Sequence, residues 1–202
     1  MNTRQVKELV LQALEHERGG ILIYQTALEC AVDERLRDEW KRYLAETKQH
    51  ERTLVDCCAA LAIDPDAETP GRAVVRHNGQ ALVEAMRMAL DAGDEAAAQI
   101  VACECVVLAE VKDHANWQLL GKVADALDGA GETLRAAYDA IEDQEDEHLY
   151  HTRGWCRELW INALGLHAVL PPPEQRRNVK SAIGAARAEA AADLDRTVSS
   201  AR

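Results

Sequence analysis

Hydrophobic residues recur along most of this chain at intervals of three and four positions, which is the period of an amphipathic helix. The pattern predicts long helices over about 4–29, 33–62, 94–127 and 133–164, and a shorter one over about 73–92. The first half of 94–127 is apolar nearly all round, as expected of a central helix. Alanine is abundant and phenylalanine is absent, a composition that also favours helix over strand.

Short segments rich in turn residues separate these helices. DPDAETPG at 64–71 and DGAGE at 128–132 interrupt the periodicity, and prolines at 171–173 end the last long helix. An alanine-rich helix with a thin apolar stripe is predicted over about 174–199. We therefore expect an all-α fold: a four-helix bundle over 1–170 made of two hairpins joined by a helical crossover, and a helical extension over 171–202.

Acidic residues lie on the apolar stripes of these helices. Glu17 interrupts the stripe of the first helix, and Glu110 that of the third long helix. A buried carboxylate without compensation costs several kcal/mol, so it must be protonated, paired or bound to a metal ion. On the last long helix Glu145 and His148 replace two apolar residues, and residues three apart lie on one helix face. This Glu-x-x-His pair predicts a shared metal ion.

The two hairpins resemble each other weakly. Glu17 is followed by Tyr24-Gln25 and Glu110 by Trp117-Gln118, each time seven residues later, and each hairpin has a glutamate and a histidine in its second helix. Such spacing is what a duplicated hairpin would leave. The repeat selects Glu110 over Glu104, which lies about 120° away around the same helix.

The pattern resembles the di-iron and di-manganese carboxylate proteins of the ferritin and rubrerythrin superfamily, over about residues 4–164. The resemblance implies a ferritin-like bundle that holds two iron ions, or manganese as the alternative, and that oxidises ferrous iron or reduces oxygen or peroxide. It implies the metal ligands Glu17, His50, Glu110, Glu145 and His148. The chain departs from the family at Thr47, where a bridging glutamate is usual, and Glu46 is the candidate to replace it.

Several alternatives compete with this interpretation. The same carboxylates and histidines would also suit a buried polar network without metal. Glu147 and His151 form a rival pair on the last long helix, although they lie off its main apolar stripe. Thr47 favours a scaffold or stress-associated binding protein with a degenerate site. A single-metal hydrolase is a third class, but it needs three convergent histidines and only His50 and His148 are well placed.

Charge and cysteine content narrow the class of protein. The formal net charge of −12 argues against nucleic acid or anionic membranes as partners. The six cysteines include no CxxC pair, so no rubredoxin-type module is expected and reducing equivalents would come from a partner protein. The cysteines are expected to be small buried hydrophobes.

Two further expectations concern location and assembly. The absence of a long apolar run and of a signal peptide predicts a cytoplasmic protein. The segment after Pro173 predicts a homodimer contact.

Overall fold

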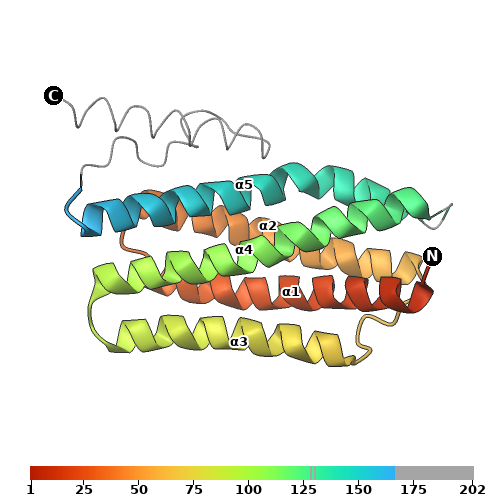
Figure 1. The fold of residues 1–202 in the computed structure, drawn as a ribbon, viewed down its shortest axis with the longest axis horizontal. Helices are drawn as coiled ribbons and strands as arrows, with labels where there is room; N and C mark the ends of the chain where they lie inside the picture. The colour runs from red at the N-terminus through yellow and green to blue at the C-terminus, as the bar shows by residue number, and fades with distance from the viewer. Residues whose placement is uncertain (128, 130, 167–202) are drawn as a thin grey trace.

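A computed structural model describes residues 1–127, 129 and 131–166 of the chain (Figure 1). The regular structure of these residues is entirely helical. The helices are α1 (Thr3–Cys30), α2 (Glu34–Ala60), α3 (Pro70–Asp91), α4 (Glu95–Ala126) and α5 (Gly131–Ala163). The all-α prediction is therefore confirmed for the described residues. The predicted helix over 174–199, the domain boundary at 170 and the predicted dimer contact lie outside them.

Short polar side chains fix where the helices begin. Asn2, Asp33, Thr69 and Asp94 each accept a hydrogen bond from a backbone N–H of the first turn of α1, α2, α3 and α4 respectively. The sequence predicted that α3 begins near residue 73, but Pro70 is already helical. Proline is favoured in the first helical turn because its missing N–H has no intrahelical partner there. The proline is thus part of the start of α3 rather than of the preceding loop.

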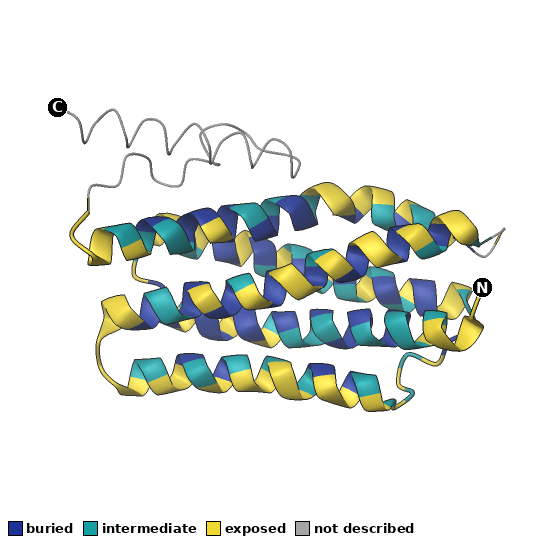
Figure 2. Cartoon of the chain, in the orientation of Figure 1, coloured by how far each residue is buried: buried dark blue, intermediate teal, exposed yellow. Residues whose placement is uncertain are grey.

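Four helices form a bundle and the fifth lies outside it. In Figure 1, α1 and α5 run in one direction, and α2 and α4 run in the other. The helices pack in the order α1–α2–α5–α4 around the bundle, while α3 contacts α1 and α4 from outside. The arrangement is two antiparallel hairpins, with α3 in the crossover between them. Figure 2 shows that exposed residues line much of α3 and that the bundle helices turn buried faces to one another.

The interior of the bundle is apolar toward both ends and polar in the middle. One apolar cluster includes Ile23, Trp40 and Trp155, and the other includes Leu14, Leu54, Leu120, Leu134 and Ile141. Five buried carboxylates and histidines occupy the stretch between these clusters: Glu17, His50, Glu110, Glu145 and His148. Any chemistry they perform would therefore take place in a layer closed off by hydrocarbon at each end.

Helix α3 is attached to α1 by charge and by close approach. Arg72 is 2% exposed, and its Nε lies 2.6 Å from Glu15 Oε2 on α1. Gly71 faces α1 as well, because a Cβ atom at this position would lie 2.1 Å from side-chain atoms of Gln12 and Glu8. These contacts hold the crossover against the outer face of α1.

Two further expectations concern the chain as a whole. All six cysteines are free, and all but the half-buried Cys156 are buried, as predicted for small hydrophobic residues. Within the described ranges, no helix has the length and apolar character needed to cross a membrane.

Candidate metal centre

Five of the six predicted metal ligands meet in the middle of the bundle. They are at most 4% exposed, and together they come from all four bundle helices: Glu17, His50, Glu110, Glu145 and His148. The Nδ1 atom of His50 lies 3.0 Å from Glu145 Oε1 and 3.7 Å from Glu17 Oε1. The Nδ1 atom of His148 lies 3.7 Å from Glu110 Oε2 and 3.9 Å from Glu145 Oε1. Glu145 therefore lies between two half-sites, one containing Glu17 and His50 and the other Glu110 and His148.

The two histidines are held by their outer nitrogens. His50 Nε2 lies 2.8 Å from Gln144 Oε1, and His148 Nε2 lies 2.7 Å from Glu46 Oε2. Both partner atoms are acceptors, so each ring donates from Nε2 and turns the lone pair of Nδ1 toward the centre. Burial lowers the pKa of His148 to about 4, which keeps this ring neutral near pH 7.

Glu46 thus lies on the outer side of the His148 ring. Its side chain is 24% exposed, and it contacts the histidine of the other hairpin rather than the interior. The remaining predicted ligands share the interior, whereas Glu46 has the position of a group that orients a ligand. Such an outer carboxylate fixes the tautomer of a metal-binding histidine and raises its basicity.

Two aromatic residues bind the glutamates in the first helix of each hairpin. Trp117 Nε1 donates to Glu17 Oε1, and Tyr24 OH donates to Glu110 Oε1, both at 2.8 Å. Each aromatic residue follows the glutamate of its own helix by seven positions and binds the glutamate of the other helix. The sequence repeat is therefore matched by reciprocal hydrogen bonds between the hairpins. The sequence repeat matched Tyr24 with Trp117 but did not predict their hydrogen-bond partners.

The inward-facing atoms of the cluster have no hydrogen-bond partner among the described residues. They are Glu17 Oε2, Glu110 Oε2, both carboxylate oxygens of Glu145, and the Nδ1 atoms of His50 and His148. Buried polar groups are normally satisfied, so a group of orphaned atoms that converge from four helices requires an explanation. Carboxylate oxygen and imidazole nitrogen are the donors that bind iron, manganese and related ions.

The pKa values show how poorly these carboxylates are compensated by the protein. Burial, and then the negative charge of Glu145, raise the pKa of Glu110 to about 8. Burial, followed by the charge of Glu46, raises the pKa of Glu145 to about 8, and burial with the charge of Asp113 raises that of Glu17. No described lysine or arginine forms an ion pair with these three side chains.

Asp113 is a member of the cluster that sequence reasoning missed. It is 4% exposed, its Oδ1 has no hydrogen-bond partner among the described residues, and burial together with the charges of Glu145 and Glu110 raises its pKa well above the usual range. The signal was available, because Asp113 follows Glu110 by three positions and so shares its face of α4.

Thr47 lies in the interior beside the centre. Its hydroxyl donates to the carbonyl oxygen of Tyr43 at 2.9 Å, and its methyl group packs on α1 at Gly20. A Cβ atom at Gly20 would lie only 3.3 Å from that methyl group. The threonine therefore fills the space between α1 and α2 at this level and offers no carboxylate to the centre.

The rival residues lie elsewhere. His151 Nδ1 lies 3.0 Å from Glu39 Oε1, and Glu147 forms an ion pair with Arg42 at the surface of the α2–α5 contact. Glu104 accepts a hydrogen bond from the indole of Trp160 at 2.9 Å. None of the three joins the five interior residues.

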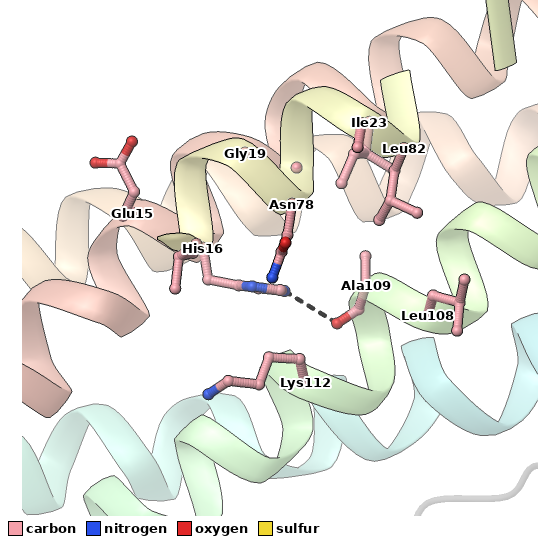
Figure 3. A pocket seen from close by; sticks show the side chains of 12 residues that line it. Glu15, His16, Gly19, Ile23, Asn78, Leu82, Leu108, Ala109 and Lys112 are labelled. Carbon is pink, nitrogen blue, oxygen red and sulfur yellow. Dashed lines mark hydrogen bonds between the residues drawn. The ribbon is translucent and has the colours of Figure 1, made fainter. Parts of the chain in front are cut away.

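A pocket of about 420 Å³ lies outside the centre, between α1, α3 and α4. Figure 3 shows His16 reaching across it, where its Nε2 donates to the carbonyl oxygen of Ala109 at 2.9 Å. His16 and Ala109 immediately precede Glu17 and Glu110 in the chain. This hydrogen bond therefore closes the outer side of the α1–α4 contact behind the two carboxylates.

Comparison with known proteins gives this chain no relative: no family model matches it, and neither curated proteins nor solved structures yield a match. Function is therefore inferred from the chemistry of the centre itself. Glu17, His50 and Glu145 offer ligand atoms that all lie within 4.8 Å of one another, and this group suits a metal ion.

Proposed function

We propose that this chain is a non-haem metalloprotein of ferritin-like type that binds two divalent ions, iron first and manganese second. The observation that carries the proposal is the convergence of unpartnered carboxylate oxygens and imidazole nitrogens in the middle of the bundle. Two hairpins joined by a long crossover are also the ferritin-like arrangement. Glu17 and His50 would hold one ion, Glu110 and His148 the other, and Glu145 would lie between them.

The charge of the cluster supports two ions rather than none. Four carboxylates surround the centre when Asp113 is included with Glu17, Glu110 and Glu145, and two divalent cations balance four negative charges. An apo centre must instead keep protons on these groups, which is what their raised pKa values express. The carboxylates are thus already in place before a cation binds, and the bound cation would replace their protons.

The residues around the centre prepare it for redox chemistry. Gln144 and Glu46 keep the two Nδ1 atoms directed inward, and Trp117 and Tyr24 hold one oxygen of each flanking glutamate. The apolar layers at both ends limit the access of water. Bound iron would supply the electrons that reduce oxygen or peroxide, or would itself be the substrate that is oxidised.

Metal content tests the proposal. We expect the apo protein to retain about two ferrous ions per chain after anaerobic loading and gel filtration, and then to consume oxygen. Glu145→Gln should lose most of the iron, because it removes the carboxylate between the half-sites. Glu142→Gln, three residues away and exposed on the same helix, is the matched control and should retain it. A wild-type chain that stays metal-free would overturn the proposal.

A single-ion centre is the second candidate. It is favoured by the compact group of Glu17, His50 and Glu145, whose ligand atoms lie closest together. The same loading experiment separates the two, because this candidate predicts one ion per chain and little effect of His148→Ala on its binding.

A further inference from the structure

The ligands of the proposed centre are almost completely enclosed, so an ion must pass between two helices to reach them. The inference that follows rests on the proposed function and concerns this path. Four contacts between neighbouring helices surround the centre: α1–α2, α1–α4, α4–α5 and α2–α5.

Two of these contacts are closed by atoms in direct contact. Between α1 and α2, the methyl group of Thr47 packs against Gly20, where even one added carbon atom would be crowded. Between α1 and α4, His16 donates to the carbonyl oxygen of Ala109, and α3 lies over the outside of both helices (Figures 1 and 3). At these two points, the contacts are filled by directly packed atoms.

The third contact is also closed. Helices α4 and α5 pack most closely of all the pairs. His114 Nε2 donates to Asp146 Oδ1 across this contact at 2.7 Å, and both side chains are only 12% exposed.

The α2–α5 contact differs because its helices pack least closely and a chain of charged groups leads inward from the surface. Arg42 on α2 is 45% exposed, and it forms ion pairs with Glu147 on α5 and with Glu46 one turn along α2. Glu46 Oε2 in turn lies 2.7 Å from His148 Nε2. Exposure falls along this chain from Arg42, through Glu147 and Glu46 at 27% and 24%, to His148 at 1%.

We propose that divalent cations enter and leave the metal centre between α2 and α5, past Glu46. In this proposal Arg42 keeps the path closed while it is ion-paired with Glu147 and Glu46. The guanidinium group ties α2 to α5 through Glu147 and neutralises the two carboxylates that an incoming cation would meet first. It also lies over the ring of Tyr43, with its Cζ atom 4.7 Å from the ring centroid, which keeps it against the bundle. When Arg42 swings into solvent, the contact loosens and both carboxylates become available.

The test is the rate at which the full chain exchanges Co²⁺, whose visible spectrum reports its coordination. Apo protein is loaded with Co²⁺, and release to excess EDTA is then followed. We expect Arg42→Gln to speed release about fivefold, the scale of a partly exposed ion-pair network, while the number of ions bound and the spectrum stay as in the wild type. Arg135→Gln is the control, because Arg135 on α5 also pairs with one carboxylate of the neighbouring helix, Asp125 of α4, and one of its own helix, Asp139, away from the centre.

A second variant distinguishes the loss of the Arg42–Glu147 ion pair from a nonspecific effect of removing one charge. Glu147→Gln removes the other end of the same bridge, so it should also speed release, and the double variant should be no faster than the faster single one. Release rates that multiply in the double variant, or that equal the wild-type rate in Arg42→Gln, would overturn the proposed path and leave the centre standing. A wild-type chain that binds no Co²⁺ would overturn the centre and the path together.

Discussion

At the scale of single residues, the two hairpins contribute matching residues to the centre except at two positions. Three residues after the first glutamate, one hairpin has Gly20 and the other has Asp113. Three residues before the histidine, one hairpin has Thr47 and the other has Glu145. One half of the centre thus has a small pair in contact, Gly20 and Thr47, and the other half has two carboxylates. The carboxylate missing at Thr47 is compensated in number by Asp113, so Thr47 need not mean a lost metal site.

This asymmetry predicts opposite effects of one substitution. Asp113→Asn removes a buried carboxylate, so it should stabilise the apo protein by about 1 kcal/mol. It should also weaken metal binding about 10- to 100-fold, as expected for a group that supports the ligands. Urea unfolding of the apo chain and competitive metal titration measure the two effects. A variant whose apo stability and affinity both fall would show that Asp113 is only a packing residue.

The burial of the five interior residues was predictable from sequence because each interrupts an apolar stripe, as Glu17 and Glu145 show. The role of Glu46 was not predictable in the same way. A shift of one position turns a side chain by about 100° around a helix, so a glutamate at 46 rather than 47 points out of the interior. Only the packing of α2 beside α5 brings it to His148, and a single sequence does not contain that distance.

At the scale of helices, α3 depends on one buried ion pair. Arg72 and Arg76 both bind Glu15, which is 7% exposed, but only Arg72 is buried and also donates to the carbonyl oxygens of Pro65 and Ala67. Its guanidinium group therefore joins α1, α3 and the loop between α2 and α3.

Arg72→Ala should accordingly destabilise the protein by about 2–3 kcal/mol, because it leaves buried acceptors without a partner. Arg76→Ala is the matched control, and its loss should be much smaller because the solvent screens the exposed pair. Chemical denaturation of the apo proteins compares them. Equal losses would mean that Arg72 contributes no more than a surface contact.

The helices themselves were largely predictable, since long periodic stripes define them and their observed ends fall within three residues of the predicted ones. The docking of α3 was not predictable. It depends on the guanidinium of Arg72 reaching Glu15 and on the space that Gly71 leaves, and neither leaves a periodic signal in the sequence.

At the scale of the whole molecule, the buried cluster couples stability to pH. Glu110 and Glu145 have pKa values raised from 4.5 to about 8, so between these values the folded protein binds more protons than the unfolded chain and stability falls as pH rises. His148, lowered from 6.5 to about 4, acts in the opposite direction, but only below pH 6.5. Between pH 6.5 and 8 the carboxylates alone determine the sign.

We therefore expect the apo protein to lose about 3 kcal/mol of stability between pH 6.5 and 8, about half of it from each of the two carboxylates. Metal ions should reverse the trend, because they replace the protons and bind more tightly as pH rises. Unfolding curves with EDTA and with saturating Mn²⁺ at several pH values provide the measurement. An apo stability that rises through this range would contradict the assignment of protonated carboxylates.

The reciprocal hydrogen bonds at the centre have one more consequence. Tyr24 and Trp117 each bind the glutamate of the opposite hairpin, and Gln144 and Glu46 each bind the opposite histidine, so all four bonds join one hairpin to the other. An α1–α2 fragment alone would lose the partner of every one of these bonds. Two chains that exchanged their α4–α5 hairpins would keep every one of these bonds. The hydrogen bonds of the centre would thus be the same whether its two halves belong to one polypeptide or to two.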